Sequence, residues 1–355
     1  YALVPIWGGY CMMIGKDTLH TATLLLFFVQ TVEWARGLRA MRARHWAVYG
    51  ILAALGCLWR NNGIYLILPS LLGFLFLRRG KARAAIAIIM ASVTLLFGLL
   101  YQVVVPALGI VDNRASGLYS VCFQQTARVV RAHRQELTAQ ETAEIDRVLD
   151  IATIGSVYEP WISDPVKLTY RQFGAGAEVE RAALARYRQT WLAMLPKYPV
   201  EYLQAFMAGN RGYYAFIPKY TGMTYSQQAG LRFVYTSFDI EGEGQLHTAQ
   251  PEGFEALRMK AAIAMESVRT IPIVQMLFTC ALYTWVLVAA GIALAHGRRW
   301  RELLLFVPAI FSFLVCLVSP VDDYFRYFLP IIAMTIPLMA CVRHPREMEV
   351  QDSTN

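Results

Sequence analysis

Three charged residues stand directly before the last apolar run of the chain. The segment SPVDDYFRYFLP, residues 319–330, contains Asp322, Asp323 and Arg326. A guanidinium offers a planar fork of donors that matches phosphate oxygens, and it keeps its charge at any physiological pH. Two neighbouring carboxylates can ligate a divalent metal, or they can cap a helix and pair with the arginine. The segment therefore predicts either an anion and metal site or a set of local pairings.

Two further polar clusters interrupt apolar sequence. They are Lys16 and Asp17 with His20 about one helical turn later, and the run Arg60, Asn61, Asn62. Charged groups at membrane depth are costly, so they usually mark a site or pair with one another. Lys16 and Asp17 have a structural alternative as an interfacial pair in which Asp17 favours a helix N-terminus. The structural alternative for Arg60 is an ion pair with Asp322, with Asp323 or with a carboxylate in the long polar stretch.

The composition indicates that lipid surrounds the elements that carry these clusters. The 355 residues are 56% hydrophobic and 13% aromatic, with a mean hydropathy of +0.39. Several apolar runs approach the roughly 20 residues that a helix needs to cross a bilayer. We therefore expect an all-α, multi-pass membrane protein with segments at 1–14, 18–36, 46–59, 64–77, 84–105, 272–295, 303–319 and 325–342.

The cations predict the orientation of these segments. Most lie in short loops and in the tail: Arg36, Arg39, Arg42, Arg44; Arg78, Arg79, Lys81, Arg83; Arg298, Arg299, Arg301; Arg343 and Arg346. The positive-inside rule assigns them to the cytoplasm, provided that WRNNGIY is the turn of a helical hairpin. The three polar clusters then share the outer face of the cytoplasmic membrane. The net charge of +8 is thus a topology signal, and no nucleic-acid partner is expected.

Four regions follow from this reading. They are N-terminal membrane helices at 1–105, an external domain at 106–271, C-terminal membrane helices at 272–342 and a cytoplasmic tail at 343–355. The external domain reads as mostly helical, since Thr138 and Glu141 have the spacing of a capping box. DIEGEGQLHTAQ, residues 239–250, departs from a calcium loop at its last position and is read as a solvated acidic loop. Because the chain starts at Tyr1 inside an apolar run, we expect an N-terminal portion to be missing.

The motifs GKDTLHTATLLLFF, LWRNNGIYLILP and FRYFLPIIAMTIP, split by a large polar stretch, resemble bacterial proteins of the GT-C glycosyltransferase class. That class includes protein mannosyltransferases and lipid A aminoarabinose transferases. The resemblance covers most of the chain and implies a GT-C-like helical bundle with an external domain. It also implies transfer of a sugar from a polyprenyl-phosphate donor to a glycan, lipid or protein acceptor of the cell envelope.

The resemblance implies a role for each polar cluster. Asp17 matches a second acidic position at the start of a membrane helix, where it assists metal or donor binding. The main catalytic base of the class would lie in an external loop before Tyr1. Arg326 with Tyr327 matches an Arg-Tyr pair that binds the lipid phosphate, and the remaining candidates for donor binding are Lys16, Arg60, Asn61 and Asn62. If the transfer uses a divalent metal, Mg or Mn, Asp322 and Asp323 are the candidates to hold it, with helix capping and pairing with Arg326 as the alternative.

Two other functions fit the same pattern. Broken helices with polar tips at membrane depth also occur in transporters, so a flippase of lipid-linked saccharides is one alternative. A polymerase or ligase of lipid-linked saccharides is the other, since it shares the donor and also carries a long external loop.

Overall fold

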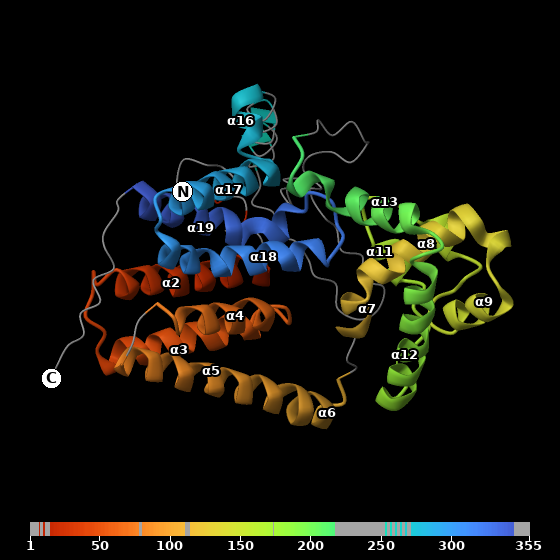
Figure 1. Ribbon diagram of the computed structural model, residues 1–355, viewed down its shortest axis with the longest axis horizontal. Helices are drawn as coiled ribbons and strands as arrows, with labels where there is room; N and C mark the ends of the chain where they lie inside the picture. Colours follow the sequence, from red (N-terminus) through yellow and green to blue (C-terminus); the bar gives the residue numbers. More distant parts are fainter. Residues whose placement is uncertain are drawn as a thin grey trace.

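The computed structural model describes residues 15–77, 80–110, 114–172, 174–216 and 271–343, together with a few single positions outside these ranges. Within these ranges the chain is helical, and its β-type pairs are isolated bridges. Figure 1 shows a bundle of long helices and a smaller group of helices at one end of it. The predicted first segment, 1–14, and the acidic loop at 239–250 lie outside the described residues.

The bundle helices lie on the other predicted apolar runs. They are α2 (Lys16–Ala35), α3 (Ala43–Leu58), α4 (Ile64–Phe74), α5 (Lys81–Leu99), α16 (Pro272–Met276), α17 (Cys280–His296), α18 (Val307–Leu317) and α19 (Phe325–Arg343). Several of these helices bury apolar side chains against neighbours: α19 lies against α2, α17 and α18, and α4 lies against α5 and α18.

Three of these helical stretches are long and apolar enough to cross a membrane: Lys81–Ala107, Trp300–Leu317 and Phe325–Arg343. The first joins α5 to a π-helical turn, Leu100–Val104, and to α6 (Val105–Ala107); the second joins a 3-10 turn, Trp300–Phe306, to α18. Two more helices, α4 and α17, are apolar but shorter. The described chain is therefore a helical protein with three candidate membrane-spanning helices.

The predicted break at WRNNGIY is confirmed. α3 ends at Leu58 and α4 begins at Ile64, and the two helices pack side by side. The approach is close, because a Cβ on Gly63 would overlap the carbonyl oxygen of Gly56. Trp59 ties the tip to α2, where its indole Nε1 donates to Thr23 Oγ1 at 3.2 Å.

The smaller group, residues 114–216, is called the central domain here. Its helices are α7 (Arg114–Leu118), α8 (Ser120–His133), α9 (Ala139–Asp146), α10 (Ile154–Val157), α11 (Asp164–Lys167), α12 (Ala177–Met194) and α13 (Pro199–Asn210), which a 3-10 turn, Arg211–Tyr213, follows. They enclose a hydrophobic core of their own around Phe123, Leu149 and Tyr187. The predicted capping box is confirmed, with the Thr138 side chain accepting from the Glu141 N–H at the start of α9.

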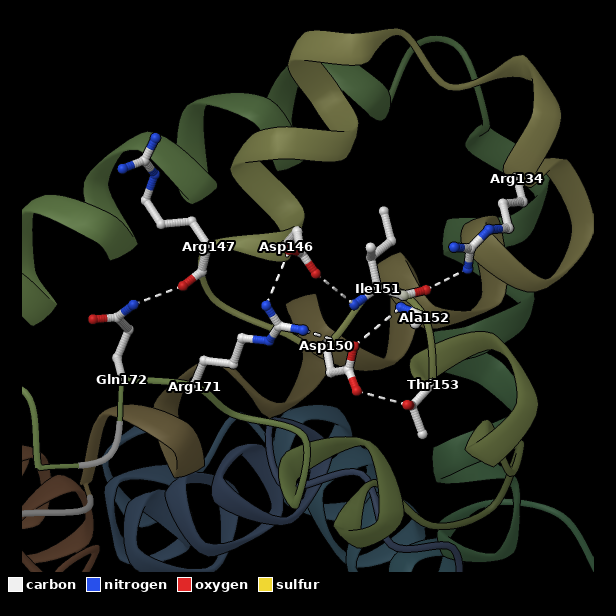
Figure 2. A network of polar contacts seen from close by, with 9 residues as sticks. All are labelled: Arg134, Asp146, Arg147, Asp150, Ile151, Ala152, Thr153, Arg171 and Gln172. Atoms are coloured by element: carbon white, nitrogen blue, oxygen red, sulfur yellow. Dashed lines mark hydrogen bonds and ion pairs between the residues drawn. The ribbon is translucent and has the colours of Figure 1, made fainter.

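An ion-pair network holds the turn between α9 and α10 (Figure 2). The guanidinium of Arg171 lies 3.0 Å from Asp146 Oδ2 and 2.8 Å from Asp150 Oδ1. Asp150 also accepts from the hydroxyl of Thr153 at 2.6 Å, and Arg134 donates to the carbonyl of Ile151. These side chains satisfy backbone and carboxylate groups of a turn that has no regular structure of its own.

The central domain is joined to the bundle through the loop 318–324, between α18 and α19. Tyr213 Oη donates to the carbonyl of Val321 at 2.8 Å, and the N–H of Asp322 donates to the carbonyl of Trp161 at the same distance. The Asp322 carboxylate accepts from the N–H of Gly212. The half of SPVDDYFRYFLP that precedes Arg326 is thus a docking element.

Close approach at this joint requires a glycine. A Cβ on Gly212 would overlap the Cβ of Asp323, whose own backbone is left-handed with φ of 49°. We therefore expect Gly212→Ala to loosen the joint and to lower the free energy of unfolding by about 1–3 kcal/mol, the usual cost of overpacking. Thermal unfolding in detergent would measure this. The control is Gly291→Ala in α17, where the added methyl meets open space; equal melting curves for both variants would contradict the docking role.

His133 provides a pH-dependent contact within the central domain. Its Nδ1 lies 2.9 Å from Glu136 Oε1, and its Nε2 lies 3.1 Å from Glu201 Oε1. The hydrogen bond with Glu136, and next the one with Glu201, raises the pKa of His133 above its ordinary value. Folding thus stabilises the protonated imidazole.

Because the pKa of His133 is higher in the folded than in the unfolded protein, the stabilisation is complete at pH values below the unfolded-state pKa, about 6.5. It disappears as the pH rises through the folded-state pKa. We expect His133→Gln to lower the melting temperature at about pH 5.5 and to change it much less at about pH 8.5. The control is His296→Gln, at the end of α17. A His133 effect that is the same at both pH values would show that the contact acts through packing alone.

Candidate functional site

The carboxylate of Asp17 lies between two guanidinium groups. Its Oδ1 accepts from Arg60 Nη1 at 2.6 Å, and its Oδ2 lies 3.0 Å from Arg326 Nε. Asp17 is in the first turn of α2, Arg60 is in the tip between α3 and α4, and Arg326 is in the first turn of α19. Residues from three distant parts of the sequence therefore share one ion-pair cluster, and we refer to these three as the Asp17 cluster.

The two arginines differ in exposure. The side chain of Arg60 is 13% exposed and that of Arg326 is 37% exposed. Arg326 Nε is close to Asp17 but makes no aligned hydrogen bond within the described chain, so this contact is an ion pair only. Arg326 is thus the member of the cluster that an incoming ligand can reach.

The ring of Tyr327 contacts both guanidinium groups. Arg60 Cζ lies 4.5 Å from the centre of the Tyr327 ring, and Arg326 Cζ lies 5.5 Å from it. Arg326 is also 5.5 Å from the ring of Tyr324, which packs edge-on against Tyr327. Cations over aromatic faces are attracted by the ring quadrupole, so the two tyrosines hold the arginines in place without neutralising them.

The Asp17 cluster has more positive than negative charge. Two guanidinium groups share one carboxylate, and Lys16, which is exposed, precedes Asp17. A partly buried cation without a full countercharge favours an anionic ligand.

A small cavity adjoins the cluster. It has a volume of about 20 Å³ and is lined by His20, Arg60, Asn62, Ser312 and Tyr327 with apolar neighbours. Both His20 Nδ1 and Ser312 Oγ are buried and have no hydrogen-bond partner among the residues that the structure describes. Since one water needs about 10–15 Å³ and two or more polar partners, the cavity has the size and chemistry for a single hydroxyl or water.

The candidates for donor binding do not all meet at this point. Asp17, Arg60, Arg326 and Tyr327 are in mutual contact, and Asn62 lines the adjoining cavity. Asn61 is turned elsewhere, where its Oδ1 accepts from Tyr101 Oη of the π-helical turn at 2.7 Å. His20, which the sequence places about one helical turn after Asp17, and Ser312, which no motif marks, both line the cavity. A polar residue in the middle of an apolar helix is the one signal for Ser312.

Asp322 and Asp323 do not form a metal site in this geometry. The Asp322 carboxylate accepts from the N–H of Gly212, and Asp323 Oδ1 accepts from the N–H of Cys280 at 3.1 Å. Within the described ranges no group of three or more His, Cys, Asp or Glu side chains could hold a metal ion. Both carboxylates are thus engaged by backbone amides in the described chain, and the Mg or Mn ion stays a prediction.

The described residues thus form a helical protein with three candidate membrane-spanning helices and a partly buried, net positive cluster of two arginines about one carboxylate. Over residues 1–355 the chain matches, and belongs to, the DUF6020 family, whose description is a family of unknown function. No curated protein and no solved structure matches the chain.

The burial of the Asp17 cluster predicts a large effect of removing its carboxylate. Asp17 is 8% exposed, and Asp17→Asn leaves two guanidinium groups without their shared partner. We expect the free energy of unfolding to fall by about 3–5 kcal/mol. The double variant Asp17→Asn/Arg60→Gln should recover part of that loss, because the two residues are directly coupled.

The matched control is Glu33→Gln on the same helix. Glu33 pairs with Arg39 at 3.0 Å, but Arg39 is exposed and Glu33 is only partly buried, so the expected loss is below about 1 kcal/mol. Chemical or thermal unfolding in detergent would measure all three variants. Equal losses for Asp17→Asn and Glu33→Gln would contradict the assignment of the Asp17 cluster as a buried constraint.

Proposed function

We propose that the chain is a multi-pass membrane protein of the GT-C type, which transfers a sugar from a polyprenyl-phosphate donor to an acceptor of the cell envelope. The observation that carries the proposal is the net positive Asp17 cluster, in which Arg326 is partly exposed and held by Tyr324 and Tyr327. A lipid phosphate is the anion that this cluster would bind.

The orientation of the bundle supports an outer site. α2 and α19 run parallel, since Asp17 contacts Arg326 at their starts and Arg36 donates to the carbonyl of Cys341 at their ends. The arginine-rich loop after α2 is at the end remote from the Asp17 cluster. With that end in the cytoplasm, the cluster and the central domain beside it face outward.

The arginines suit the leaving group of the reaction. In such a transfer an acceptor oxygen attacks the anomeric carbon, the bond from that carbon to the phosphate oxygen breaks, and the lipid phosphate leaves with one more negative charge. A guanidinium that is already in place stabilises this charge as it develops, because it needs no reorganisation during the reaction. Arg326 provides direct contact, and Arg60 adds positive charge from below.

Asp17 acts as a positioning residue in this proposal. Both of its carboxylate oxygens lie against guanidinium nitrogens, so neither is directed toward an acceptor hydroxyl. The proton of that hydroxyl goes to a base that the proposal does not assign.

Transport of a lipid-linked saccharide is the second candidate, and one observation favours it. α4 has 11 residues, about 16 Å of helix, which is short of the roughly 30 Å of a hydrocarbon core. A short helix that begins at a polar tip is also how transporters build a binding site at membrane depth. The lipid-linked sugar is the shared ligand, and transfer to an acceptor distinguishes the two functions.

Substitution of the arginines tests the proposal. We expect Arg326→Ala to weaken polyprenyl-phosphate binding by about 10- to 100-fold, since a hydrogen bond to a charged group contributes about 1.5–3 kcal/mol. Binding to purified full-length protein would be measured by titration with polyprenyl phosphate. Mass spectrometry of envelope glycans and lipid-linked sugars, from cells with wild-type or variant protein, would measure transfer.

Arg301→Ala, in the 3-10 turn before α18, is the control, because it removes an exposed arginine at the other end of the bundle. Unchanged binding and transfer for Arg326→Ala at equal protein level would rule out the phosphate assignment. The transporter would be favoured by two results together: wild-type cells form no glycosylated product, and cells with Arg326→Ala lose export of the lipid-linked sugar.

A further inference from the structure

A second cavity lies at the opposite end of α2 and α19 from the Asp17 cluster. Its volume is about 450 Å³, within the range of pockets that hold small molecules. Val29 and Val32 of α2, with Pro337 and Ala340 of α19, give it apolar walls, and Glu33 and Arg36 are its charged lining residues. We refer to it as the α2–α19 groove.

Arg36 is a buried cation with an unused donor. Its side chain is 6% exposed, and its Nη2 donates to Glu302 Oε2 at 2.7 Å and to the carbonyl of Cys341 at 2.6 Å. Its Nε is buried without a hydrogen-bond partner among the described residues. A buried donor left unsatisfied costs about 1–3 kcal/mol, so an acceptor from a ligand in the groove would be stabilising.

The countercharge of Arg36 is shared with a second arginine. Arg299 lies 2.5 Å and 2.7 Å from the two carboxylate oxygens of Glu302 and donates to the carbonyls of Cys341 and Val342. Glu302 is itself 4% exposed. One buried carboxylate therefore faces two guanidinium groups, and the groove lies against an excess of positive charge.

The surroundings of the groove add to this charge. Leu38 lines the groove from the loop after α2, and that loop also holds the exposed Arg39 and Arg42. Glu33 pairs with Arg39, so this carboxylate does not neutralise the charge of Arg42. Basic pockets between membrane helices are a known way of binding anionic lipid head groups.

We propose that the α2–α19 groove binds one anionic glycerophospholipid from the bilayer leaflet at the arginine-rich end. An acyl chain would lie along the valine and alanine walls, and a phosphate or ester oxygen would accept from Arg36, with Arg39 and Arg42 in the adjoining loop. This rests on the bundle lying in a bilayer, as proposed above, and is independent of sugar transfer.

The position of the groove gives the lipid a structural role. The same two helices provide Asp17 and Arg326 at their other ends. A lipid seated between their ends completes the α2 to α19 packing where the two helices leave a gap.

Filling the groove tests the proposal. Ala340 is exposed on α19 and lines the groove, so Ala340→Trp would occupy the space without crowding the core. Ile336→Trp is the matched control, because Ile336 is 53% exposed on the same helix and does not line the groove. The purified full chain would be placed in nanodiscs with equal phosphatidylglycerol and phosphatidylcholine, then released into detergent for native mass spectrometry.

We expect wild type and Ile336→Trp to retain one phosphatidylglycerol per chain and Ala340→Trp to lose it. Thermal unfolding in detergent should show stabilisation by added phosphatidylglycerol, but not by phosphatidylcholine, in wild type and not in Ala340→Trp. Equal retention of the two lipids by wild type would overturn the proposal, and so would retention by Ala340→Trp. If Ala340→Trp fails to fold, the test is the double variant Arg39→Gln/Arg42→Gln. The proposal then requires that wild type prefers phosphatidylglycerol to phosphatidylcholine and that the double variant loses this preference.

These outcomes are separate from those of the proposed function. Arg326→Ala should retain the phosphatidylglycerol, since Arg326 is at the other end of α19. Loss of polyprenyl-phosphate binding in Arg326→Ala and loss of phospholipid in Ala340→Trp therefore report on different sites.

Discussion

A single buried carboxylate between two guanidinium groups sets the geometry of this protein. Asp17 requires the start of α2, the tip of the α3–α4 hairpin and the start of α19 to meet at one point. Two other features bring the same elements together: the absence of a side chain at Gly63 lets the hairpin close, and Trp59 connects its tip to α2. Because removing one member of a buried pair is strongly unfavourable, the three elements can separate only together.

The loop before α19 joins two functions in a few residues. Asp322 and Asp323 hold backbone amides of the central domain and of α17, and Arg326, a few positions later, faces Asp17. The contacts that dock the central domain therefore lie only a few residues before Arg326, so a displacement of that domain would also displace the Asp17 cluster.

The helices could be predicted from sequence, because apolar runs and local signals encode them. Thr138 with Glu141 predicts the start of α9, and the polar run at Arg60 predicts the break between α3 and α4. The partner of Arg60 was predicted wrongly, since the sequence suggested Asp322, Asp323 or a carboxylate of the long polar stretch, and the structure pairs Arg60 with Asp17. Pairing between distant helices depends on their register, which neither periodicity nor composition specifies. The α2–α19 groove is a packing gap and leaves no sequence signal.

The stretch Lys81–Ala107 has a mechanical consequence. Its 27 residues form about 40 Å of helix, longer than a hydrocarbon core of about 30 Å, and little of its surface is covered by protein. Such a helix tilts or protrudes according to bilayer thickness. Near its far end Tyr101 donates to Asn61, next to Arg60. A change in the tilt of this stretch would therefore be transmitted to the hairpin through its packing against α3 and α4, and to the tip through the hydrogen bond from Tyr101 to Asn61.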